Sequence, residues 1–261
     1  MNPFILPLGL MAVVFFGIIV LNERYQLLAA DRFPSPPAKL GAYAWLGIFL
    51  FGIVALVTAA ALKVPTAKQL AATPFYRLFA LHWILILFLV VWWLLSGRPP
   101  ITEYLNIRRE RVGEAVMTGF AVGFGGWIFT LAVALVIGLI LSAAGLIPKN
   151  PQPSPMIGYM AGLALWKKFT IVASAMTVEE AFFRGWLQKR IGLVASTILF
   201  AIAHSGLGQP LLLIGVFVIS LIIGFTFYRT KNLIPCIIAH GVFDAVQLFV
   251  ILPVVFKMIG G

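Results

Sequence analysis

The stretch MTVEEAFFRGW, residues 176–186, places two adjacent carboxylates and an arginine inside an apolar part of the chain. Of the 261 residues, 62% are hydrophobic and only 10% are charged. Soluble domains run nearer half apolar and a quarter charged, so this composition indicates an integral membrane protein. An ionisable group in a membrane-spanning segment is energetically expensive and is therefore a candidate for function.

The apolar runs predict the fold class. A transmembrane helix needs roughly 20 mostly apolar residues. The expected spans are residues 3–22, 40–62, 78–96, 115–146, 169–188, 191–205, 210–228 and 232–256. We therefore predict an all-α protein, a polytopic bundle of about eight transmembrane helices in the cell membrane. The first run has no basic stretch before it, so it is interpreted as a retained helix and not as a signal peptide.

Two regions of the chain differ in whether they contain a recognisable motif. Residues 1–150 are expected to form N-terminal transmembrane helices without a recognised motif, and residues 151–261 to form a catalytic helical core within one integrated membrane domain. The single cysteine, Cys236, excludes an intramolecular disulfide. The sequence does not define an oligomeric state.

The net charge of +11 comes from 19 Lys and Arg against 8 Asp and Glu. These basic residues lie in short clusters between the apolar runs, which is typical of contact with a lipid bilayer and argues against nucleic-acid binding. With the N-terminus outside, the inner loops hold 11 Lys and Arg and the outer loops 7. The predicted orientation is N-terminus outside, with a site that opens toward the cytoplasmic face.

Four polar residues in three predicted spans lie at a similar depth. Glu179 is ten residues before Lys189, or about 15 Å along a helix, and His204 is 14 residues after Arg190, or about 21 Å. His240 and Asp244 follow Lys231 by 9 and 13 residues, or about 13 and 20 Å. Because unrelated polar residues would not be expected to agree in depth, we expect these groups to form one site.

The spacing within the first of these helices gives the two adjacent carboxylates different expected partners. Glu180 and Arg184 are four residues apart, so they share a helix face and are expected to form a structural ion pair. Glu179 points about 100° away and lacks that partner. A buried carboxylate without a fixed cation can act as a base, which makes Glu179 the candidate reactive group.

The other two helices show the same four-residue spacing. Phe200 is expected to pack under the imidazole of His204, and Asp244 to hold one ring nitrogen of His240. Gly206 and Gly208 end a helix near His204. A helix that stops within the bilayer implies a cavity, because its free backbone groups must face protein or water.

These residues match three motifs of a known family. EEAFFR (179–184) fits EExxxR, FAIAH (200–204) fits FxxxH, and HGVFD (240–244) fits HxxxN/D. In order and spacing, residues 160–256 resemble the CPBP family, which comprises CAAX proteases and bacteriocin-processing enzymes and is also called the Abi family. The chain is similar to type 2 CAAX prenyl endopeptidases.

The resemblance implies an intramembrane endopeptidase acting on membrane-associated or prenylated, CAAX-like proteins or peptides. Glu179 and His204 would activate a water molecule, and His240 with the residue four positions on would stabilise the oxyanion. That last residue is often Asn in the prenyl-protein enzymes. Asp244 donates a hydrogen bond only when protonated, so it would instead orient His240.

Three alternatives remain open at this stage. Glu179, His204, His240 and Asp244 have ligand types that suit Zn²⁺, although glutamate-activated water needs no cofactor and the HExxH motif is absent. A proton-coupled transporter could use the same buried groups as a relay. A non-catalytic immunity or scaffold membrane protein is the third alternative, but it would not need all three motifs intact.

Two features outside the motifs carry structural expectations. His82 lies five residues after Arg77, near the edge of a predicted span, and is interpreted as a structural or interfacial histidine. Gly119 and Gly123, with Gly125 and Gly126, are expected to allow close helix packing.

Overall fold

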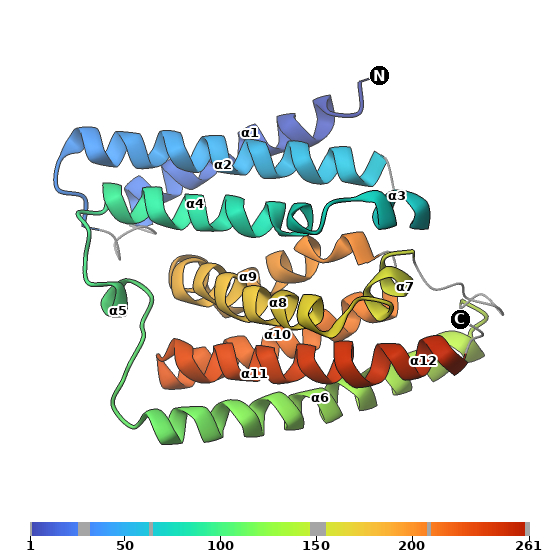
Figure 1. The fold of residues 1–261 in the computed structure, drawn as a ribbon. Helices are drawn as coiled ribbons and strands as arrows, with labels where there is room; N and C mark the ends of the chain where they lie inside the picture. Colours follow the sequence, from blue (N-terminus) through green and yellow to red (C-terminus); the bar gives the residue numbers. More distant parts are fainter. Residues whose placement is uncertain (1, 26–31, 63–64, 147–154, 208–209, 259–261) are drawn as a thin grey trace.

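A computed structural model of the chain describes residues 2–25, 32–62, 65–146, 155–207 and 210–258, and these contain helices and loops but no strand (Figure 1). The first half contains α1 Ile5–Tyr25, α2 Pro36–Leu62, α3 Ala67–Ala72, η1 Phe75–Phe79, α4 Ala80–Leu95, α5 Ile101–Tyr104 and α6 Val112–Ala143. The second contains α7 Pro155–Ala161, α8 Leu165–Ser174, η2 Ala175–Glu179, η3 Ala181–Gln188, α9 Lys189–Ala203, η4 Ser205–Leu207, α10 Pro210–Thr230, α11 Leu233–Ala245, η5 Val246–Ile251 and α12 Leu252–Met258. The predicted all-α class is confirmed.

Seven helical segments of the described chain are long and apolar enough to cross a membrane, which confirms a multi-pass integral membrane protein. The fifth of these, Leu165–Ala203, covers both spans predicted over 169–188 and 191–205. Its helical turns are interrupted at Gly192, whose φ of 80° lies in the left-handed region that favours glycine. Glu179 and His204 are 25 positions apart and yet lie 3.7 Å from each other, whereas 25 residues of one straight helix would span about 37 Å. The chain therefore folds back at this break, and the predicted boundary between two helices is confirmed.

Local sequence explains several helix starts. Pro36 opens α2, where a missing N–H costs nothing because the first turn has no intrahelical acceptor for it. Thr66 and Gln69 form a capping box at α3. The Asn232 side chain accepts a hydrogen bond from the backbone N–H of Ile234 and so caps α11. The proline-rich residues 147–154 lie outside the described part of the chain.

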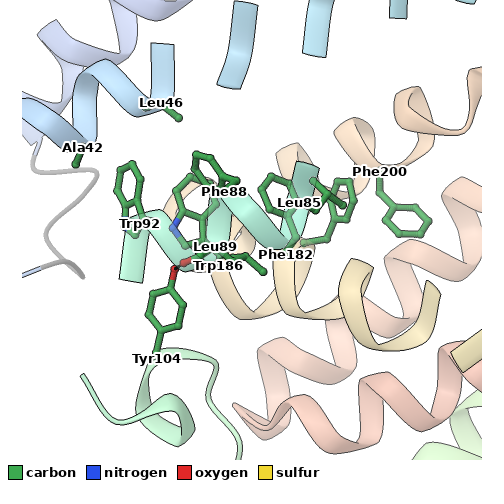
Figure 2. Close-up of a cluster of buried hydrophobic side chains, with 11 residues drawn as sticks. Ala42, Leu46, Leu85, Phe88, Leu89, Trp92, Tyr104, Phe182, Trp186 and Phe200 are labelled. Atoms are coloured by element: carbon green, nitrogen blue, oxygen red, sulfur yellow. Dashed lines mark hydrogen bonds between the residues drawn. The ribbon is translucent and has the colours of Figure 1, made fainter. Parts of the chain in front are cut away.

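An aromatic cluster joins the N-terminal helices to the region that carries the motifs. Figure 2 shows Phe88 and Trp92 of α4 beside Trp186 of η3, with ring centroids 4.7 and 5.0 Å from the Trp186 ring. Phe182, also on η3, packs against Phe88. The cluster continues to Ala42 and Leu46 of α2, so the helix with the paired carboxylates is held against α4 by apolar packing.

The long helix α6 packs against α11 through glycine. A Cβ atom at Gly119 would lie 2.5 Å from Cβ of Ile238, and one at Gly123 would lie 2.7 Å from Cβ of Val242. Gly126 is similarly close to Ile219 of α10, whereas nothing lies within 4 Å of a Cβ at Gly125. The expected packing role is thus confirmed at Gly119, Gly123 and Gly126, and it is wrong at Gly125.

Gly123→Ala should destabilise the protein. The added Cβ would meet Val242 and the backbone oxygen of Ala239 below normal contact distance, so we expect a loss of about 1–3 kcal/mol in the free energy of unfolding. Gly125→Ala is the matched control and should be neutral or slightly stabilising, because alanine favours helix. The measurement is thermal unfolding of both variants in detergent. Equal melting temperatures would contradict the close packing of α6 and α11.

Candidate active site

The two adjacent carboxylates lie on a widened helix. Glu179 ends the π-helical turn η2, and Glu180 immediately precedes the π-helical segment η3. Such turns are rare and occur frequently at functional sites. Both side chains are buried, but they point to different neighbours, so one helix supplies two separate carboxylate environments.

Glu180 and Arg184 form the predicted ion pair. Nη1 of Arg184 donates to Oε1 of Glu180 at 3.0 Å; Arg184 is 2% exposed and Glu180 is 0% exposed. Nη2 of Arg184 donates to both the backbone oxygen and the hydroxyl oxygen of Ser220 at 2.9 Å. The guanidinium also lies 4.7 Å from the ring centroid of Phe200. The arginine thus fixes η3 against α9 and α10.

His240 lies between two carboxylates. Its Nδ1 is 2.8 Å from Oε1 of Glu180, and its Nε2 is 3.3 Å from Oδ2 of Asp244. The contact with Asp244 was expected from the spacing, and the contact with Glu180 was not. Because carboxylate oxygens only accept hydrogen bonds, both contacts are satisfied when both ring nitrogens carry a hydrogen.

Glu179 faces two other histidines. Its Oε1 is 3.0 Å from Nε2 of His82, and its Oε2 is 3.7 Å from Nε2 of His204. Nδ1 of His204 is 2.9 Å from the backbone oxygen of Phe200, an acceptor, so Nδ1 carries the hydrogen of the neutral ring. The Phe200 ring stacks on the imidazole with centroids 4.5 Å apart, as expected. Nε2 of His204 is therefore held toward Glu179 as an acceptor.

His82, interpreted from sequence as a structural or interfacial histidine, lies at the candidate site. It lies in the first turn of α4, its side chain is 13% exposed, and it contacts Glu179 directly. Arg77 belongs to the separate turn η1, so its position did not mark His82 as interfacial. The available signal was the rule that a histidine within a span is a functional candidate by default.

A cavity of about 490 Å³ brings these groups together. Its walls include His82, Glu179, His204, His240 and Asp244. Glu180 and Arg184 do not line it and lie behind the wall. The remaining lining is mostly apolar and comes from α6, α7, α8, η2 and α9 through α12. The predicted convergence of polar groups from three spans is present, with a fourth helix, α4, added.

The cavity extends toward one end of the bundle. Its lining continues to Met160 of α7, Leu211 in the first turn of α10 and Leu252 at the start of α12. Figure 1 shows that α7 and α12 share the end of the bundle opposite α5. Lys189 and Lys231 lie at the α5 end, which the charge count places inside. The lining thus reaches toward the end of the bundle opposite the one that the charge count places inside.

The zinc alternative was tested against this geometry. Within the described residues, no group of three or more His, Cys, Asp or Glu side chains is arranged to hold a metal ion. His240 has both ring nitrogens on carboxylates, and His82 has its two nitrogens on Ser174 and Glu179. In this protonation pattern, Nε2 of His204 is the ring nitrogen whose lone pair faces Glu179, whereas zinc sites take three or four protein ligands, so the side chains as arranged here do not form a zinc site.

Comparison with known proteins agrees with the motifs. Residues 160–246 match the family described as "Type II CAAX prenyl endopeptidase Rce1-like", which confirms the predicted resemblance over the part of the chain that carries all three motifs. The chain is thus a multi-pass integral membrane protein with a region similar to type II CAAX prenyl endopeptidases.

A bacterial relative shares part of this sequence. The chain is 42% identical over 69 residues to "Uncharacterized protein YpbD" of Bacillus subtilis (strain 168), a stretch of 26% of this chain and 36% of that protein. The chain thus aligns with about a third of that relative. No solved structure matches the chain.

Arg184→Leu should destabilise the protein severely. It removes the guanidinium from a buried ion pair and leaves His240 as the remaining partner of Glu180, so we expect a loss of about 3–5 kcal/mol in the free energy of unfolding and poor accumulation in membranes. Adding Glu180→Gln should recover part of the accumulation. Glu114→Gln, which removes the exposed pair with Arg111, is the control and should leave the level unchanged. A normal level of Arg184→Leu protein on immunoblots would contradict the structural role of the pair.

Proposed function

We propose that the protein is an intramembrane endopeptidase that hydrolyses peptide bonds with a water molecule activated by Glu179 and His204. The observation that carries the proposal is the position of these groups on one cavity wall, with Oε2 of Glu179 and Nε2 of His204 facing each other at 3.7 Å. That separation exceeds a direct hydrogen bond and suits a water molecule that donates to both atoms.

The reaction follows from the acceptor roles of the two side chains. Glu179 takes a proton from the water molecule while the water oxygen forms a bond to the carbonyl carbon of the substrate. The resulting tetrahedral intermediate collapses when the C–N bond breaks, and the proton passes from Glu179 to the leaving nitrogen. His204, held in one tautomer by Phe200, orients the water throughout.

His240 and Asp244 line the same cavity and are assigned to the developing oxyanion. The Nε2–H of His240 is the donor available in this arrangement, and it points toward Asp244. Asp244 therefore orients the ring when it is ionised. Glu180 supports His240 from behind the wall at 2.8 Å, so the residue also serves the site indirectly.

The substrates are inferred from the cavity and the family match. Most of the lining is apolar, which favours a peptide within a membrane protein or one attached to a lipid. The match to type II CAAX prenyl endopeptidases supports prenylated, CAAX-like proteins or peptides as one such class. The mechanism assigns no step to zinc, since carboxylate and imidazole acceptors suffice to activate the water.

Glu179→Gln should abolish proteolysis while leaving the fold intact, because the amide keeps the size of the side chain but cannot take a proton. Cells expressing wild-type protein or the variant at equal level would be compared for membrane and secreted peptides. Specific precursors should accumulate only with the variant. Identical peptide profiles with a difference in proton flux would support the transporter alternative and contradict the protease.

Substitution of Asp244 separates orientation from acid chemistry. Asp244→Asn should keep activity within about tenfold, since its oxygen still accepts from His240 and its NH₂ group can donate to the oxyanion. Asp244→Leu should lose on the order of 100-fold, because His240, the proposed oxyanion donor, is then no longer oriented. The rate of precursor processing measures both. If the Asp244→Asn and Asp244→Leu variants were equally inactive, Asp244 would act through its charge or its proton. That result would contradict its assignment as the residue that orients His240.

A further inference from the structure

A side chain from the motif-free N-terminal helices completes the environment of Glu179. His82 belongs to α4 and lies 97 positions from Glu179 in the sequence, outside the region 160–246 that matches the endopeptidase family. Its Nε2 is 3.0 Å from Oε1 of Glu179, and its Nδ1 is 2.7 Å from the hydroxyl oxygen of Ser174. Nothing in the proposed mechanism so far requires this contact.

The directions of the hydrogen bonds that link Ser174, His82 and Glu179 follow from the ionisation state of Glu179. A base must begin the reaction as a carboxylate, which only accepts hydrogen bonds. Nε2 of His82 therefore donates to Glu179, and in the neutral ring Nδ1 accepts from the Ser174 hydroxyl. Ser174 precedes Glu179 on the same helical segment, so the imidazole bridges α4 to the helix that bears the base.

We propose that His82 is a positioning residue for the general base, a role that rests on the proposed function. By binding Oε1, it fixes the carboxylate so that Oε2 faces His204 across the gap where the water is activated. The hydrogen bond also stabilises the negative charge of Glu179 inside the bundle. Residues 1–150 thus contribute to the chemistry as well as to packing, through α4 and its aromatic contacts with η3.

Two isosteres of histidine separate positioning from packing. Glutamine can place its side-chain nitrogen where Nε2 lies, and asparagine where Nδ1 lies. His82→Gln should therefore process the precursors that accumulate with Glu179→Gln within about fivefold of the wild-type rate. His82→Asn should be slower on the order of 100-fold, because a displaced catalytic group loses its productive geometry. Trp83→Phe, at a neighbouring position that is 62% exposed, is the control and should process normally.

The rates would be measured by pulse-chase labelling of those precursors in cells and divided by the membrane level of each variant, which is measured separately. A purely structural role would lower the level of both His82 variants and would not distinguish glutamine from asparagine. If His82→Asn processed precursors at the wild-type rate while Glu179→Gln was inactive, the proposed role of His82 would be overturned and the proposed function would stand. The absence of any precursor with Glu179→Gln would overturn the proposed function and this proposal together.

Discussion

The interaction on which the rest of the site depends is the ion pair of Glu180 and Arg184, enclosed by protein within a chain that crosses a membrane. Two charges in such a place are costly unless each finds partners, and here the pair is completed by Ser220 and His240. These contacts reach from η3 to α10 and α11. A network built to offset the cost of charge therefore also sets the relative positions of the helices around the cavity.

That network leaves the neighbouring carboxylate available for chemistry. Glu180 lies behind the cavity wall, where it pairs with Arg184 and contacts His240, while Glu179 faces His82 and His204 on the cavity itself. The π-helical turns on either side of Glu180 lie where this division occurs. Adjacent residues of one helix thus serve different purposes: one carboxylate is tied into the structure, and the other has an oxygen directed at the proposed water position.

Contacts within one helix were predictable from sequence, and contacts between helices were not. The pairs Glu180–Arg184, Phe200–His204 and His240–Asp244 follow from four-residue spacing and are present. The contacts of Glu179 with His82 and of Glu180 with His240 join residues 97 and 60 positions apart, and spacing carries no information about them. The break at Gly192 was anticipated as a helix boundary, whereas the direction of the cavity depends on how α7, α10 and α12 pack and could not be inferred from charge.

The central claim is that a carboxylate, without a metal, activates the water that cleaves the peptide. Purified protein in phospholipid vesicles, stripped of metals with a chelator, would be incubated in H₂¹⁸O with a precursor that accumulates in Glu179→Gln cells. The account predicts continued cleavage, with one ¹⁸O atom in the new C-terminal carboxylate measured by mass spectrometry, and no product with the Gln variant. Loss of cleavage on chelation that zinc restores, or a product without ¹⁸O, would contradict it.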